Sequence, residues 1–201
     1  MRIIRMVTNK YKQPLKASSG RMTKQKNKGF TLVDTLVAIA ILSISILSTF
    51  TAVQSALQSS LFARDQINAF YLIQEAMESV RNTRDGNALA NIASLSSGGS
   101  GVNWLHGISE SAGDPCYFGN VCIVDSPQKQ MTYCGTSFGS CPFIKEDTVS
   151  GLFGYNNNWT DTKFKREIQL QQIGPDEIIV SVRVSWSGKT IQIQETLFNT
   201  R

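Results

Sequence analysis

The sequence predicts an α+β fold in which one long N-terminal helix packs on a C-terminal antiparallel sheet, with a loop-rich insertion between them. Two observations support this fold class. No proline or glycine occurs between Phe30 and Asp85, so nothing in that range interrupts a helix. From Phe164 onward, apolar and polar residues alternate as they do in strands with one buried face.

Residues 1–29 form a basic segment that holds nine lysines and arginines and no acid. Such an excess ahead of a first membrane span predicts a cytoplasmic N-terminus and export of the rest of the chain. We expect this segment to be a leader that is removed, with Met22 as the true start. Without its nine cations the chain keeps 11 cations against 15 acids, so the formal charge of +5 becomes −4 from Phe30 onward.

Residues 30–50 form an apolar run of about 20 residues, the length that crosses a bilayer as a helix. Asp34 is the one ionisable residue in this run, and a charge in lipid costs about 3 kcal/mol on insertion scales. Alternatively, a carboxylate one turn into a span lies at headgroup level, where water solvates it. A secretory signal peptide is disfavoured because its apolar core is shorter and ends at a small-residue cleavage site.

The junction KNKG at 26–29, followed by FTLVD at 30–34, resembles the type IV prepilin signature. The resemblance implies that a prepilin peptidase cuts after Gly29 and that the new N-terminal residue, Phe30, is methylated. The family usually has Glu as the fifth mature residue, where this chain has Asp34. The resemblance further implies that Asp34 is a filament assembly residue, which pairs with the terminal amine of a neighbouring subunit.

The second half of the helix is amphipathic, with apolar residues at three- and four-residue steps between polar ones. These apolar residues are Val53, Ala56, Leu57, Leu61, Ile67, Phe70, Tyr71, Met77 and Val80. We predict one helix over 30–84, with Arg81 and Arg84 near its negative C-terminal end and Gly86 as its stop. A coiled coil is disfavoured because the steps hold no strict seven-residue repeat.

Residues 85–163 are rich in Gly, Ser and Asn, which predicts surface loops with a few short strands. The stretch Ser96–Gly101 is expected to be flexible. All four cysteines lie here, and in an exported chain they favour disulfides, for which three pairings exist. We favour Cys116 with Cys122 and Cys134 with Cys141, because each closes a small loop. Zinc is disfavoured because gaps of five and six residues exceed its usual spacing.

The segment GTSFG at 135–139 matches the G-x-S-x-G pattern of hydrolase nucleophile elbows. That elbow needs a helix after the serine and a histidine later in the chain. Here Pro142 follows closely and the one histidine, His106, lies upstream. The sequence therefore predicts neither an enzyme nor a cofactor or metal site.

Residues 164–201 predict an antiparallel meander of three strands, over about 164–171, 180–186 and 191–197. Its apolar face needs cover, and the apolar stripe on the second half of the helix is the sizeable partner available. This arrangement is pilin-like. A nucleic-acid site is disfavoured by the negative mature charge, and five cations are interpreted as a solvated face. They are Lys163, Lys165, Arg166, Arg183 and Lys189.

The sequence therefore predicts a minor type IV pilin or a type II secretion pseudopilin. Its expected partners are the prepilin peptidase, other pilin or pseudopilin subunits and the inner-membrane assembly platform. It would lie in the cytoplasmic membrane with its C-terminus outside, and then in an extracellular or periplasmic filament. The alternative is a signal-anchored exported binding or hydrolytic domain that never assembles, in which Asp34 has no special role.

Overall fold

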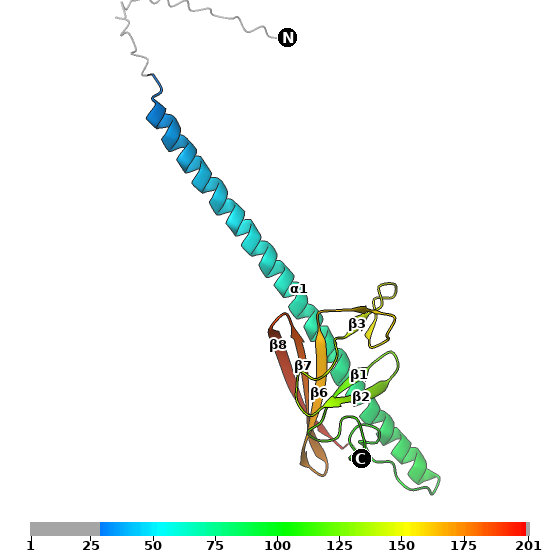
Figure 1. The fold of residues 1–201 in the computed structure, drawn as a ribbon. Coiled ribbons are helices and arrows are strands. Elements are labelled where there is room, and N and C mark those ends of the chain that lie inside the picture. The colour runs from blue at the N-terminus through cyan, green and yellow to red at the C-terminus, as the bar shows by residue number, and fades with distance from the viewer. Residues whose placement is uncertain (1–28, 200–201) are drawn as a thin grey trace, which may run out of the picture. The chain divides into compact units, whose positions relative to one another are not determined.

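The computed structural model describes residues 29–199, so the predicted leader lies outside the described residues except for Gly29. In this described part of the chain, a single helix, α1 (Leu32–Ser96), precedes eight strands (Figure 1). The chain divides into two compact units, of which the first ends at Ala52 and the second, the head, begins at Val53. The strands are β1 (Val121–Asp125), β2 (Gln130–Gly135), β3 (Lys145–Glu146), β4 (Phe153–Gly154), β5 (Thr160–Asp161), β6 (Lys165–Gly174), β7 (Glu177–Trp186) and β8 (Lys189–Phe198).

The described part of the first unit consists of the start of α1 and the residues just before it. Every residue from Gly29 to Ala52 is exposed, although most of them are apolar. α1 is long and apolar enough to cross a membrane, by length and composition. The predicted apolar span is therefore a helix whose side chains are not covered by any of residues 29–199.

The helix continues beyond the predicted end at Arg84 and stops at Ser96. Gly86 does not end it because Gly86 lacks the positive φ of a helix-capping glycine. Gly98 has that conformation, with φ 78°. The amide of Gly98 donates to the carbonyl of Leu95 and that of Gly99 to the carbonyl of Ser94, the two bonds of a Schellman cap. The stretch predicted to be flexible thus contains the helix stop.

The five-stranded sheet has the order β2-β1-β6-β7-β8, and all its neighbouring strands are antiparallel. The predicted C-terminal meander is confirmed as β6, β7 and β8. Two further strands, β1 and β2, come from the region predicted to be mainly loops. The short strands β4-β3-β5 form a separate three-stranded sheet.

The second half of α1 packs on the inner face of the five-stranded sheet, as predicted. Both of the faces that meet consist of aliphatic side chains that are almost fully buried. From α1 these are Ala69, Leu72, Ile73, Ala76, Met77 and Val80, and from the sheet Ile168, Leu170, Val180, Val182, Val184 and Leu197. Burial at three- and four-residue steps on the helix and two-residue steps on the strands follows their different periods.

Arg166 of β6 lies in this interface and is completely buried, so its assignment to a solvated face was wrong. Its Nη1 donates to Glu75 Oε2 at 2.8 Å and to the carbonyl of Leu72 at 3.3 Å, both on α1. Its Nη2 donates to the carbonyl of Val124 in β1 at 2.7 Å. Strand alternation puts Arg166 on the same face as Ile168. Its charge is tolerated in the interior because it is paired with Glu75.

Substitution at two glycines tests where α1 ends. Gly98→Ala should lower the free energy of unfolding by about 1 kcal/mol, because alanine disfavours positive φ. Gly86→Ala should raise it by roughly 0.5–1 kcal/mol, because a Cβ there meets no atom within 4 Å and stiffens the unfolded chain. Urea unfolding of the full chain in detergent, followed by tryptophan fluorescence, measures both. If both substitutions changed the free energy of unfolding by the same amount and in the same direction, a helix that ends at Ser96 would be contradicted.

Removal of the Arg166 guanidinium tests its role between helix and sheet. Arg166→Met should cost about 3 kcal/mol of unfolding free energy, because Glu75 loses its partner and the buried contacts to Leu72 and Val124 disappear. Lys163→Met is the matched control, since Lys163 pairs with Asp65 at 2.6 Å but is half exposed. That change should cost less than about 1 kcal/mol. The same unfolding assay compares them, and equal costs would count against the buried pair.

Candidate functional site

The N-terminus of α1 is closed by a reciprocal contact between Thr31 and Asp34. The backbone amide of Thr31 donates to Asp34 Oδ2 at 3.0 Å, and the Thr31 hydroxyl donates to the same oxygen at 2.8 Å. In return, the amide of Asp34 donates to Thr31 Oγ1 at 3.3 Å. Thr31 is therefore the N-cap and Asp34 the third helical residue of a capping box.

This geometry gives the Asp34 carboxylate two favourable contributions from the helix itself. It accepts hydrogen bonds that the first turn of a helix otherwise leaves unmade, and it lies near the positive end of the helix dipole. Both bonds within the described chain go to Oδ2. Oδ1 can therefore accept a proton donor from outside the chain without opening the cap.

The hydroxyl groups in the apolar part of α1 are satisfied within the helix. Each one donates to a backbone carbonyl three or four residues earlier, as Ser43 does to Ile39 at 2.8 Å and Ser45 to Ile41 at 2.9 Å. The others are Thr35, Ser48, Thr49 and Thr51. A polar group bonded in this way adds little cost to a helix in lipid or in a dry helix bundle.

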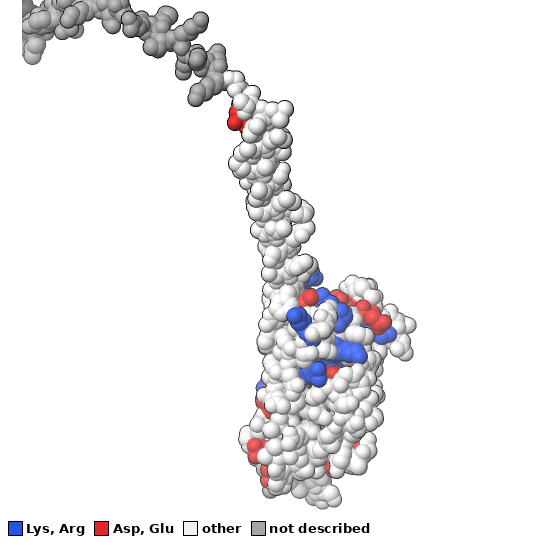
Figure 2. All heavy atoms as spheres, turned by 60° about the vertical axis from the view of Figure 1, so that its left-hand side comes forward, with Lys and Arg blue, Asp and Glu red and all other residues white. Residues whose placement is uncertain are grey.

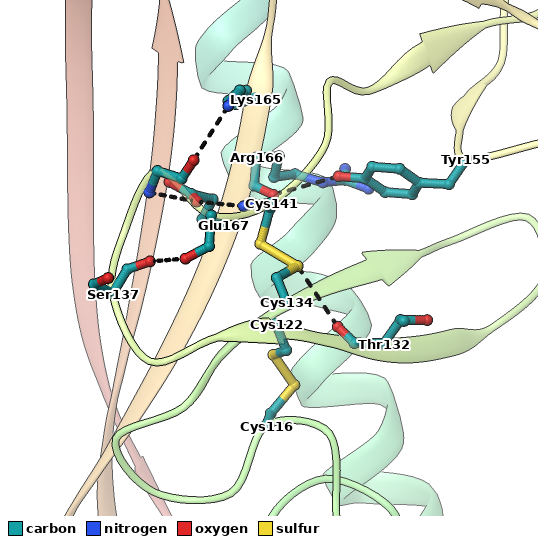
Figure 3. Close-up of a disulfide and its surroundings, with 12 residues drawn as sticks. Cys116, Cys122, Thr132, Cys134, Ser137, Cys141, Tyr155, Lys165, Arg166 and Glu167 are labelled. Carbon is teal, nitrogen blue, oxygen red and sulfur yellow. Dashed lines mark hydrogen bonds between the residues drawn. A yellow bond between two sulfur atoms is a disulfide. The ribbon is translucent and has the colours of Figure 1, made fainter.

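The head contains both disulfides that we favoured, Cys116–Cys122 and Cys134–Cys141 (Figure 3). Cys116 and Cys122 are completely buried, whereas Cys134 is partly exposed. The first disulfide lies in the main core, and the second lies on the outer face of the sheet.

The loop 135–140 is held by Glu167, whose side chain is almost fully buried. Glu167 Oε1 accepts the amides of Gly139 at 2.7 Å and Cys141 at 3.2 Å (Figure 3). Tyr155 lies nearby and donates to the carbonyl of Arg166 at 3.3 Å, and burial raises the pKa of Tyr155 to about 12. The outer face of the sheet is therefore packed and hydrogen-bonded around this loop.

The G-x-S-x-G segment has no elbow geometry. β2 ends at Gly135, and the hydroxyl of Ser140 donates to the carbonyl of Ser137 inside the disulfide loop. The next regular element is the short strand β3 and not a helix. His106 contacts Glu110 at 2.6 Å. Among residues 29–199 there is no group of three or more His, Cys, Asp or Glu that could hold a metal ion.

Sequence inspection selected Asp34 but missed its partner Thr31, although the spacing T-x-x-D before an apolar run signals a capping box. Inspection also gave no sign that Glu167 would hold a loop. A single acid among alternating strand residues has no local pattern that marks it as buried. The cysteines Cys134 and Cys141 were identified, but the carboxylate that fixes their loop lies far along the chain, in β6.

Comparison with known proteins identifies one matching family model. Residues 24–50 match the prokaryotic N-terminal methylation motif. The chain thus carries a type IV prepilin-like signal, in which Gly29, Phe30 and Asp34 all lie, and a pilin or pseudopilin family is consistent with it. No curated protein and no solved structure matches the chain.

The two disulfides should differ in their resistance to reduction in the folded protein. Dithiothreitol should reduce Cys134–Cys141 first, because Cys134 is partly exposed while Cys116 and Cys122 are buried. Glu167→Ala should speed that first reduction and leave the second unchanged, because it frees the loop amides. Alkylation followed by peptide mass mapping gives both rates in one sample. Simultaneous reduction of the two bonds would show that the loop is not held as described.

Proposed function

We propose that this protein is the precursor of a structural subunit of a type IV pilus or related pseudopilus, in a minor role. One observation carries the proposal: the methylation motif at 24–50 includes the start of a helix whose residues from Leu32 to Ala52 are all exposed. An apolar surface of that extent requires lipid or the apolar helices of neighbouring subunits. A subunit that leaves the membrane for a filament meets these two environments in turn.

Processing would begin in the cytoplasmic membrane. A prepilin peptidase would cut after Gly29, and Phe30 would become the methylated N-terminal residue. Gly29 and Phe30 precede the first helical residue, Leu32, so the proposed cleavage point lies in non-helical chain just before α1. A peptidase needs such non-helical backbone in order to reach the peptide bond.

Asp34 would then act in assembly. In a bundle of helices an unpaired carboxylate is costly, and the amine of a neighbouring subunit would be a partner of opposite charge. The capping contact leaves Oδ1 open to that amine while Thr31 holds the carboxylate in place. A contact of this kind fixes the axial position of one helix against the next, which is a positional role and not catalysis.

The remaining parts fit an exported subunit. The head follows the span in the chain, and its two disulfides suit an oxidising compartment. Other pilin or pseudopilin subunits and an inner-membrane assembly platform would be the partners of the helix. The competing function is an anchored exported domain that never assembles. In that case the N-terminal segment would not be cleaved after Gly29.

Expression of the full precursor with a prepilin peptidase tests the proposal, together with a matched series at the capping box. The wild-type chain should begin at methylated Phe30, as measured by the mass of its N-terminal peptide, and should appear in sheared filaments. Asp34→Asn keeps a cap acceptor but removes the charge. The Asp34→Asn precursor should be processed, but the amount of sheared filaments should fall at least tenfold. Asp34→Glu should keep the wild-type amount.

Thr31→Ala is the control for capping, because it removes the cap hydroxyl and leaves the Asp34 charge. It should assemble better than Asp34→Asn. Full assembly of Asp34→Asn would reduce Asp34 to a capping residue. A wild-type chain that keeps Lys28 and Gly29 in the presence of an active peptidase would end the pilin proposal and favour the anchored domain.

A further inference from the structure

A polar pocket lies on the outer face of the head, between the β1–β2 hairpin and the loop that follows β4. Its volume is about 570 Å³. The register of the hairpin sets Ile123 opposite Thr132 and Asp125 opposite Gln130, so the residues of each pair lie side by side. Ile123 also belongs to the hydrophobic cluster on that face, so the pocket borders packed side chains. Its uncharged polar lining consists of Gln128, Gln130, Thr132, Asn156, Asn157 and Asn158.

Asp125, at the end of β1, contributes a buried carboxylate to this lining. Asp125 is 8% exposed, and its Oδ1 has no hydrogen-bond partner among the described residues. No hydrogen bond or ion pair joins either carboxylate oxygen to residues 29–199. Elsewhere on the head, cations pair with acids, as Lys163 does with Asp65, and Figure 2 shows lysines and arginines beside acids on one face. A buried charge without a partner is costly, so the Asp125 carboxylate calls for a ligand that donates hydrogen bonds to it.

The charged groups around Asp125 do not neutralise it. Arg166 donates to the carbonyl of the residue before it, but the ion pair of Arg166 is with an acid of α1. Lys145 of β3 donates to a carbonyl of the loop after β4 at 3.5 Å, and its ion pair is with an acid of β5. Lys129, in the turn between β1 and β2, is exposed and forms no ion pair with residues 29–199. Asp125 is thus the one charged residue among the described residues that line the pocket, which disfavours anionic ligands.

Gly154 in β4 allows the chain to close over this carboxylate. A Cβ at Gly154 would lie 2.9 Å from Asp125 Oδ1 and 2.8 Å from the ring of Trp159, so a larger residue does not fit without movement. The loop that follows is held in a turn, because the amides of Asn158 and Trp159 donate to the side chain and the carbonyl of Asn156, at 3.0 and 3.1 Å. The pocket is therefore formed before a ligand arrives, which lowers the ordering cost of binding.

We propose that this pocket binds one neutral sugar unit of a polysaccharide, whose hydroxyl groups donate to the Asp125 carboxylate. The inference goes beyond the proposed function and does not depend on filament assembly. A sugar hydroxyl both donates and accepts hydrogen bonds, and the side-chain amides of the lining do the same, so the two sets match. The volume of the pocket is in the range of small-molecule sites.

Cationic ligands fit this lining less well than a sugar does. A metal ion needs several oxygen ligands, and residues 29–199 hold no group of three or more His, Cys, Asp or Glu that could supply them. A lysine or arginine side chain of another protein would pair with Asp125, but it only donates hydrogen bonds. The amide N–H groups of the lining would then receive no acceptor from the ligand. A sugar serves the carboxylate and the amides together.

Sugar binding can be measured on the full chain in phosphatidylcholine nanodiscs, which carry no sugar headgroups. Saturation-transfer NMR would titrate glucose, galactose, mannose and N-acetylglucosamine. At least one should bind saturably with a Kd of about 1 mM, the affinity that a few hydrogen bonds give a small ligand. The corresponding uronic acid, which adds a carboxylate, should bind at least tenfold more weakly. Binding by none of the four sugars, or binding of calcium chloride or methylammonium chloride in their place, would overturn the proposal.

Competition experiments separate two sources of the sugar. Displacement of the bound sugar by envelope polysaccharide of the protein's own host would assign the ligand to that envelope. Displacement only by polysaccharides from other cells would assign it to a foreign surface. Displacement by neither would overturn a polysaccharide as the ligand.

Asp125→Asn separates a ligand-binding carboxylate from a structural one. It keeps the shape of the side chain and removes the charge, so it should weaken sugar binding at least tenfold. It should also raise the Tm by about 3 °C, because a buried charge without a partner destabilises the head. Gln130→Ala, at an exposed lining residue, should weaken binding several-fold and leave the Tm unchanged. Asp85→Asn is the matched control, since Asp85 is an exposed acid outside the pocket, and it should leave sugar binding unchanged.

Unchanged sugar affinity in Asp125→Asn, or a lower Tm together with weaker binding, would overturn the proposal. The N-terminal peptide of the protein from its own host separates this inference from the proposed function. A chain that begins at methylated Phe30 but binds no sugar overturns the sugar site alone. A chain that retains Gly29 but binds the sugar overturns the filament function alone.

Discussion

The head depends on one buried cation, the guanidinium of Arg166. It connects α1, through Glu75 and the carbonyl of Leu72, to β1, through the carbonyl of Val124. The aliphatic contacts around Arg166 are strong, but they would let the helix slide along the sheet. Hydrogen bonds to a charged group tolerate only small changes in distance and angle. Arg166 thus fixes the position of the helix on the sheet. The ion pairs from Arg81 to Glu195 and from Asp65 to Lys163 also join α1 to the rest of the head. Their side chains are partly exposed, so these pairs contribute less to stability.

Arg166 and its neighbour Glu167 show how one strand organises both faces of the sheet. Consecutive strand residues point to opposite faces, so Arg166 faces the helix and Glu167 faces the Cys134–Cys141 loop. Both side chains are buried and charged, and each is hydrogen-bonded to groups far from it in the chain. The disulfide closes the loop, and Glu167 then places it on the sheet (Figure 3).

α1 obeys two different requirements along its length. Residues up to Ala52 have exposed apolar side chains, internally bonded hydroxyls and a capped N-terminus. These are the properties of a helix that needs lipid or other helices as its surroundings. From Ala69 to Val80 the apolar residues are buried against the sheet instead. Lys and Arg are absent between Gly29 and Arg64, so the change of surroundings coincides with the first cation after the span.

The sequence by itself determined the apolar span, the methylation motif and the three C-terminal strands, whereas it favoured the two local disulfide pairs and left the choice among three pairings to the structure. Each of these depends on residues close together in the chain, where periodicity and spacing carry the information. The helix end was missed because Gly86 and Gly98 differ in backbone conformation and not in residue type. The tertiary structure alone decided that Arg166 and Glu167 are buried, and that β1 and β2 extend the sheet. Burial of a charge requires partners such as Glu75 and the amide of Gly139, which are distant in sequence and come together only when the chain folds.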